Sequence, residues 1–151
     1  MNTNGNPKLK TTIAALAFGC ALLLAGASAA GEFTISPTSM KVWAPAQTAE
    51  LTVATGARSQ AVGQVRVMRW TRSGGRDVLT TTRDVVASPP VLRMAPNRET
   101  TIRLVRTSKA PVRGKECYRI LVDQLPQTGG KGAQVAFTIR HSVPLCFENR
   151  G

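Results

Sequence analysis

The sequence contains few of the residues that most enzyme active sites use. It has one histidine, His141, and its 8 acidic residues are scattered along 151 positions. It has no cluster of cysteines and histidines at metal-ligand spacing, and no phosphate loop, dinucleotide fingerprint or G-x-S-x-G motif. The stretch Ser73-Gly74-Gly75-Arg76 precedes no helical pattern, so we interpret it as a hairpin turn. We therefore expect neither an enzyme nor a protein that binds a metal or cofactor, and we interpret His141 as a half-exposed strand residue.

Long apolar runs are also scarce, and the longest lies near the N-terminus. Two lysines precede the run 13–25, and three small residues, Ala27-Ser28-Ala29, follow it. A basic start, a short apolar stretch and an A-x-A site are typical of a secretory signal peptide. The run is too short to span a membrane comfortably. We predict a signal peptide at 1–29, an exported domain at 30–151, and no membrane-spanning segment after cleavage.

After residue 30 the sequence lacks any sustained helical periodicity. Short runs rich in β-branched residues recur instead, with Gly, Pro, Asn and Ser between them, a pattern typical of strands and turns. About seven strands in one small domain predict an all-β, immunoglobulin-like sandwich. The predicted strand segments are 33–36, 40–43, 49–54, 64–70, 84–88, 100–106, 117–125 and 135–147.

Alternation of apolar and polar residues assigns a core-facing side to several of these segments. Around Trp70 the alternation is ambiguous, because Val65 and Val67 lie on one face while Met68 and Trp70 lie on the other; a β-bulge is one interpretation. The residues predicted to face the core are Ala49, Leu51, Val53, Ile102, Leu104, Tyr118, Ile120 and Val122.

Acidic residues are few beside basic ones. Without the two lysines of the signal peptide, 18 basic residues face 8 acidic ones, a net charge of +10, and 14 of the basic residues are arginines. A basic domain can bind nucleic acid, but export and the scarcity of aromatic residues argue against that partner. We interpret the charge as a solvated basic surface that attracts acidic partners or anionic lipid.

Several segments, in this order, resemble the N-terminal domain of periplasmic chaperones of the chaperone–usher pilus pathway, the PapD-like family. The resemblance covers about 33–147. It also predicts a cis X-Pro bond in the corner Ser88-Pro89-Pro90. The matching segments are ISPTSMKVWAP (35–45), ASPPVLRMAPN (87–97), TTIRLVR (100–106), YRILVDQLP (118–126) and FTIRHSVPLCF (137–147).

The resemblance implies a periplasmic chaperone whose partners are pilus or fimbrial subunits and an outer-membrane usher. Members of the family lend the last strand of this domain to subunits that lack their own final strand, which is a form of β-augmentation. Here the lent residues would be Val135, Phe137 and Ile139. The residues alone leave an alternative open: these side chains fill the domain's own core, and the protein is an exported structural or adhesive module without chaperone activity.

Family members have two immunoglobulin-like domains, and the subunit sits between them. This chain ends at Gly151, where the linker to the second domain would begin, and a family arginine that braces the two domains falls at Glu148. The expectation is an N-terminal domain alone, as a short form or a fragment.

The strands 117–125 and 135–147 are expected to form an antiparallel hairpin. Some family members carry a disulfide between these strands, at positions that match Leu121 and Ser142, and these two numbers sum to 263. Opposed residues of an antiparallel pair share a constant sum. Cys117 and Cys146 also sum to 263, so they are expected to lie opposite each other. Export permits a disulfide between them, although the sequence leaves open whether it forms.

The family's two basic anchors, which grip the subunit's C-terminal carboxylate, fall at Ser39 and Pro144, and neither residue is basic. Lys41 is a candidate replacement, with an exposed strand lysine as the alternative interpretation. Arg140 is a weaker candidate, because the same register sets it opposite Asp123 as a cross-strand ion pair.

Overall fold

The computed structural model describes residues 33–126 and 138–149. The expected signal peptide, and the predicted donor residues Val135 and Phe137, lie outside the described residues. Within the described residues, no helix is long and apolar enough to cross a membrane.

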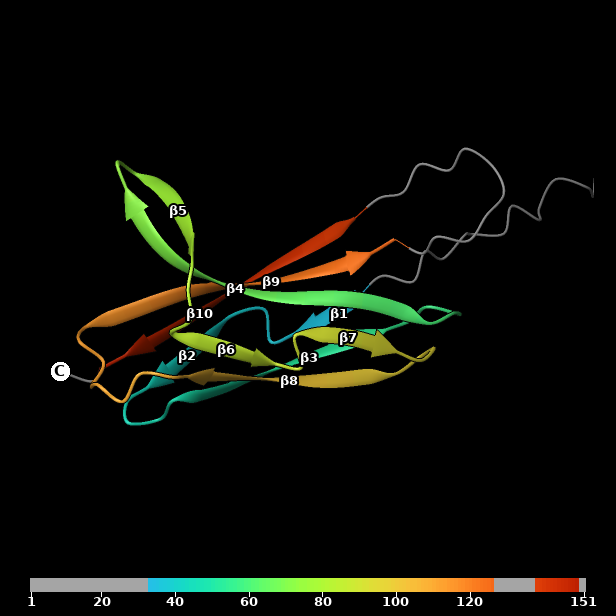
Figure 1. The fold of residues 1–151 in the computed structure, drawn as a ribbon, viewed down its shortest axis with the longest axis horizontal. Coiled ribbons are helices and arrows are strands. Elements are labelled where there is room, and N and C mark those ends of the chain that lie inside the picture. The colour runs from blue at the N-terminus through green and yellow to red at the C-terminus, as the bar shows by residue number, and fades with distance from the viewer. Residues whose placement is uncertain (1–32, 127–137, 150–151) are drawn as a thin grey trace, which may run out of the picture.

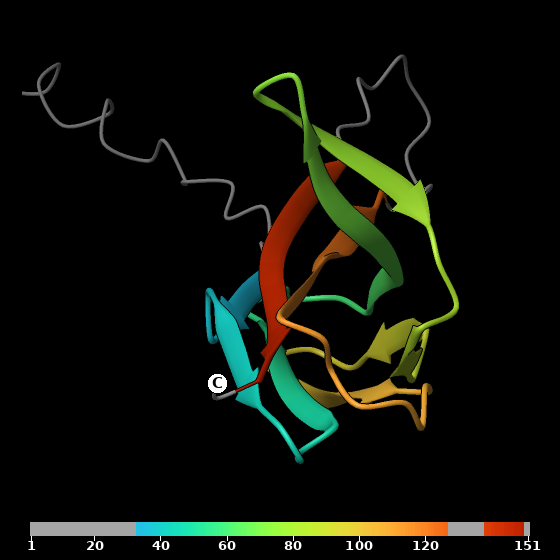
Figure 2. The same ribbon diagram turned by 90° about the vertical axis from the view of Figure 1, so that its left-hand side faces the viewer.

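Over these two ranges, ten β-strands form two sheets that pack face to face (Figures 1 and 2). One sheet has the order β1-β3-β8-β6; the other has the order β2-β10-β9-β4-β5, with β7 also paired to β4. This arrangement confirms the predicted sandwich. The strands are β1 (Phe33–Ser36), β2 (Met40–Trp43), β3 (Thr48–Thr55), β4 (Ala61–Ser73), β5 (Arg76–Thr81), β6 (Val85–Ser88), β7 (Val91–Met94), β8 (Glu99–Arg106), β9 (Lys115–Leu125) and β10 (Ile139–Glu148).

Two strands, β5 and β7, were absent from the sequence prediction. Every residue of β5 is exposed, so burial imposes no apolar alternation on it. β7 has four residues and directly follows a Pro-Pro pair whose Ser88–Pro89 bond is cis, as predicted. The turn between β4 and β5 is the predicted hairpin. Ser73 pairs with Arg76 across Gly74 and Gly75, whose φ angles of 57° and 77° suit a two-residue type I′ turn.

The ladder between β9 and β10 has the predicted register throughout its length. Cys117 lies opposite Cys146, and Asp123 lies opposite Arg140. The β4–β9 ladder is equally continuous from Val62 to Arg69, so these pairings contain no bulge. Trp70 lies on the outer face instead, where the guanidinium of Arg119 stacks 4.0 Å from the ring centroid.

The core lies between the two sheets and contains the side chains that alternation predicted. Seven of those eight are fully buried, and Ala49 is half-buried against them. The odd-numbered residues Val143, Leu145 and Phe147 of β10 join this core, and the Phe147 ring meets Tyr118 edge to face at 6.1 Å. Gly63 is required by a close approach, because a Cβ there would lie 2.6 Å from the Phe33 ring.

A buried arginine joins the two sheets at one end of the sandwich. Arg106 of β8 is 4% exposed, and its Nε and Nη2 donate to the Glu116 carboxylate of β9 at 2.9 and 3.0 Å. Its Nη1 donates to the carbonyl oxygens of Ser108 and Ala110 at 2.7 and 2.8 Å. All of its nitrogens therefore have partners, which is the condition for tolerating a buried charge.

We predict that Glu116→Gln lowers the free energy of unfolding by about 3 kcal/mol, because the buried Arg106 charge loses its counter-ion. Hydrogen bonds from Arg106 hold the pKa of Glu116 below its ordinary value of 4.5. The carboxylate's contribution is thus complete above that value and is lost as the pH falls through the lowered folded-state pKa. Denaturant titrations from neutral to acidic pH measure both effects.

The matched control is Glu50→Gln, because Glu50 pairs with Arg103 in a solvent-exposed ion pair. That change should alter stability by less than about 1 kcal/mol. Equal effects of the two substitutions would contradict a structural role for the buried pair.

The structure joins Cys117 to Cys146 by a disulfide between β9 and β10, with a Cα–Cα distance of 4.2 Å. We predict that replacing both cysteines by serine lowers the free energy of unfolding by about 3 kcal/mol, because the bond closes a loop across a sequence separation of 29. Denaturant unfolding measures this loss. A thiol count on the oxidised, denatured domain should find no free thiol at these positions; two reactive thiols would refute the bond.

Candidate binding site: the open edge of the last strand

The last strand, β10, has a neighbour on both sides only in its second half. It pairs with β9 from Ile139 to Glu148 but with β2 only from Leu145 to Glu148. In the described part of the chain, residues 139–144 therefore have no strand on the β2 side. In Figure 2, β10 (red) runs well past the end of β2 (cyan). This free backbone edge can accept another strand.

The edge is open because the beginning of the domain switches between sheets. β1 pairs with β3 in one sheet, and after Pro37 the chain crosses to pair as β2 with β10 in the other. Within 33–126 and 138–149, only the last four residues of β10 have a strand on this side as a result. Pro144, the residue before the first β2 contact, has no N–H to donate and is therefore suited to an uncovered edge.

Side chains along this edge alternate between the two faces of the sheet. Ile139 and His141 are half-buried, and Val143 is buried, whereas Arg140 and Ser142 are exposed. Ile139 is an even number of residues from Val143, so its side chain lies on the same, core-facing side of the sheet. His141 is half-buried in β10, which agrees with the predicted half-exposed strand residue, and its Nε2 atom is buried without a hydrogen-bond partner among the described residues.

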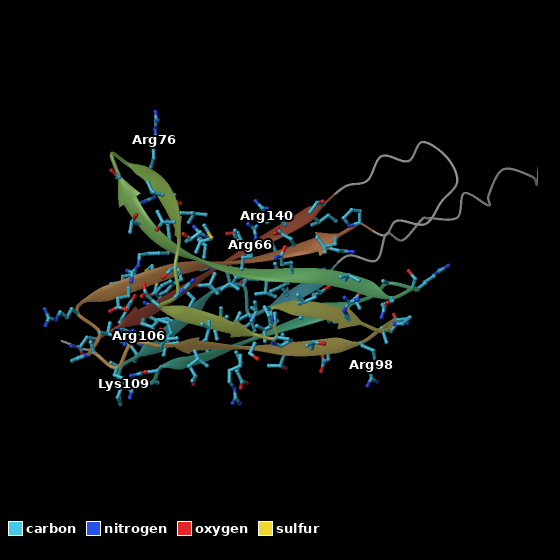
Figure 3. All side chains as sticks on the ribbon, viewed as in Figure 1. Arg66, Arg76, Arg98, Arg106, Lys109 and Arg140 are labelled. Atoms are coloured by element: carbon cyan, nitrogen blue, oxygen red, sulfur yellow. A yellow bond between two sulfur atoms is a disulfide. The ribbon has the colours of Figure 1, made fainter. Side chains whose placement is uncertain are left out.

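Arg140 is held by Asp123, as the register predicted. Its Nε lies 2.5 Å from Asp123 Oδ1, and Arg66 Nη2 lies 2.6 Å from Oδ2. The hydrogen bond from Arg140, with a further one from Arg66, lowers the pKa of Asp123 against the opposing effect of burial. Figure 3 shows Arg66 and Arg140 side by side on the outer face. Sequence reasoning missed Arg66, because the pairing of β4 with β9 is long-range and leaves no local signal.

Lys41 lies at the other end of the edge. It is opposite Cys146, with Nζ 3.6 Å from Glu148 Oε2 and 5.4 Å from the centre of the Trp43 ring. Six positions along β10 separate Cys146 from Arg140, roughly 20 Å of strand. Lys41 and Arg140 therefore cannot grip one carboxylate together.

Ser39, the position of the first family anchor, is exposed and directly precedes the Met40–Leu145 pair. Pro144 directly precedes Leu145 in the same pair, so the two anchor positions of the family both adjoin the end of the β2–β10 ladder where the edge opens. Among residues 33–126 and 138–149, no three His, Cys, Asp or Glu side chains are arranged to hold a metal ion.

Comparison with known proteins identifies the family to which this domain is similar. Residues 32–149 match the family model described as pili and flagellar-assembly chaperone, PapD N-terminal domain. No curated protein sequence matches the chain.

Solved structures match in fold. A chain of the CsuC–CsuE chaperone–tip adhesion subunit complex from the archaic Csu pili of Acinetobacter baumannii is 26% identical, with a TM-score of 0.69 over 80% of this chain and 58% of that one. The SafA pilin–SafB chaperone complex of Salmonella enterica matches at 18% identity and a TM-score of 0.64, over 80% and 55%. A PapD-like domain of human CEP192 shares the fold at 14% identity and a TM-score of 0.52, over 78% and 84%.

This chain spans a little more than half the length of the pilus chaperone structures it matches. The family model covers nearly all of the sandwich, including the strand that carries the open edge. The chain therefore belongs to the family of pili and flagellar-assembly chaperones, through its PapD N-terminal domain.

Proposed function

We propose that this domain is a periplasmic chaperone module that binds pilus or fimbrial subunits by lending them the first half of its last strand. The open edge of β10 at residues 139–144 is the observation that carries the proposal. It is the part of the last strand whose backbone can pair with a second protein while β9 still holds it.

The physical basis is strand addition. The edge offers main-chain hydrogen bonds, which supply pairing, and every second side chain, which supplies selectivity. Ile139 faces the inner side at this edge, and residues of the same parity in an extended strand, Val135 and Phe137, would follow it into an apolar groove of the subunit. These three are the proposed donor residues.

The proposed partners follow from the same chemistry. A subunit that lacks one strand presents an unpaired edge and an open apolar groove, and both can be satisfied by the lent strand. Two matched structures are complexes of a chaperone with a pilus subunit, which supports a subunit as the partner here. An outer-membrane usher would receive the complex. The predicted signal peptide supports the periplasm as the location, and no nucleic acid is involved.

The rival function is an exported immunoglobulin-like module without chaperone activity. The match to a PapD-like domain of human CEP192 is the reason to test this alternative, because at 14% identity that match shows only a shared fold. Capture of a subunit separates the two functions.

We predict that Ile139→Asp and Phe137→Asp each lower subunit capture by more than about a hundredfold while the domain stays folded, because an unpaired carboxylate would be buried in the subunit groove at a cost of several kcal/mol. The measurement is co-purification of the tagged domain, secreted to the periplasm, with a co-expressed pilus subunit from which its own donor segment has been deleted.

The matched control is Val91→Asp, since Val91 is 48% exposed on β7, away from the β10 edge. It should leave capture unchanged. Equal recovery of subunit by the Ile139 variant and the unsubstituted domain would refute donation. Global unfolding of the Phe137 variant would place that ring in the domain's own core.

Lys41 is the better of the two proposed carboxylate anchors. Arg140 is held tightly by Asp123, with Nε 2.5 Å from Oδ1. Lys41 Nζ, by contrast, lies 3.6 Å from Glu148, which pairs more closely with Lys115 at 3.1 Å. We predict that Lys41→Gln weakens capture about tenfold, the loss of one charge-assisted hydrogen bond. Lys115→Gln is the matched control, because Lys115 also contacts Glu148 from the far side of β10. Equal losses in the two variants would assign the effect to Glu148 and not to a subunit carboxylate.

A further inference from the structure

Asp123 lies on β9, beside the first residues of the open edge of β10. It faces Arg140 in the second residue pair of the β9–β10 ladder, after Ile139 and Gln124. Both of its carboxylate oxygens accept hydrogen bonds from arginines, one from β10 and one from β4. The Asp123 side chain is 5% exposed, although those of Arg66 and Arg140 are 40% and 55% exposed. The two arginines therefore cover the carboxylate and leave it no room for solvent.

We infer that Asp123 is the positioning residue that fixes the register of the donor segment, through its ion pair with Arg140 on β10. The inference rests on the proposed function, which it deepens by naming what aims the lent side chains.

The β9–β10 register is fixed because any shift of β10 would separate the charge of Arg140 from that of Asp123. A slip of one residue would turn Arg140 to the inner face, against the apolar core. A slip of two would keep the face but bring Thr138 or Ser142 opposite Asp123. The buried carboxylate would then keep only Arg66, and a buried charge that loses a partner is strongly destabilising. Neither slip is tolerated while Asp123 is charged.

The other restraints on β10 act on its second half. β2 pairs only with residues 145–148, and the disulfide ends at Cys146. Within the residues that the structure describes, residues 139–144 are paired with β9 alone. Among the described residues, Asp123–Arg140 is the one ion pair that β10 makes in this half. It therefore restrains the part of the strand that the subunit would engage.

Register decides which side chains a subunit meets. Because side chains alternate along a strand, a shift by one residue would present the opposite set to the groove, and a shift by two would move each side chain one pocket along. A donor segment with a fixed register meets the subunit with its apolar residues already aligned.

The test compares Asp123→Asn with Asp77→Asn by amide hydrogen exchange and by capture of the subunit without its donor segment. Asp77 is also held by two arginines, Arg72 and Arg119, but lies on β5, at the opposite edge of the sheet from the donor strand. In Asp123→Asn, the amides of residues 139 and 141, which point toward β9, should exchange about tenfold faster, while amides 145–148 keep their protection. Capture should fall about tenfold. Asp77→Asn should change neither.

Arg140→Gln is the second variant, and it separates register from folding. It removes the same cross-strand contact but leaves Asp123 paired with Arg66. The same changes in exchange and capture are expected, even if Asp123→Asn does not fold.

Rescue by a covalent bond shows whether the residue acts through register. Leu121 faces Ser142 in the same ladder, four residues along from the Cys117–Cys146 pair, so it has the same pair type and faces the same side of the sheet. Adding Leu121→Cys and Ser142→Cys to either variant should form a second disulfide that holds the register. Capture should then return to within about threefold of the unsubstituted domain.

Unchanged exchange at the amides of residues 139 and 141 in Arg140→Gln would overturn the inference, as would lost capture that the second disulfide does not restore. Failure of the unsubstituted domain to capture any subunit would instead overturn the proposed function. In that case the exchange result alone decides whether Asp123 fixes the register.

Discussion

The antiparallel ladder between β9 and β10 is the contact on which the rest of the domain depends. It carries the disulfide, places three core residues of β10 between the sheets and sets Asp123 against Arg140. Because β9 also pairs with β4, every residue of the last strand is positioned relative to the centre of its sheet. Among the residues that the structure describes, no strand pairs with the other side of β10 at its start, because β2 reaches only Leu145–Glu148.

An uncovered edge is a liability as well as a site, since it can pair with another copy of the chain. The outward side chains at this edge are Arg140 and Ser142, and the predicted exported domain carries a net charge of +10. Like charges on every copy disfavour self-association. The charged and polar outer face thus disfavours pairing with a second copy of the chain. The apolar inner face favours a partner that has a groove for the inner side chains.

The two halves of β10 are held by different means, and the difference suits the proposed donation, in which the strand would stay in place while its first half pairs with a subunit. The second half is fixed by β2, a covalent bond and the packing of Leu145 and Phe147. In the part of the chain that the structure describes, the first half is held by the β9 ladder and by the Asp123–Arg140 ion pair. Firm attachment at one end allows the other to pair with a second protein without losing the fold.

The sequence by itself determined the strands with alternating burial and the turn at Gly74-Gly75, because these depend on local patterns. The β9–β10 register came from the resemblance to the chaperone family, whose disulfide positions at Leu121 and Ser142 set the sum that Cys117 and Cys146 share. The sequence did not determine β5, because an exposed strand has no apolar alternation, nor the sheet switch between β1 and β2, which depends on which distant strand each meets. Arg66 became a partner of Asp123 only when β4 packed beside β9, because long-range strand pairing decides which charges meet. The open edge was decided in the same way: the sequence contains the last strand, but only the tertiary structure shows how much of it β2 leaves uncovered.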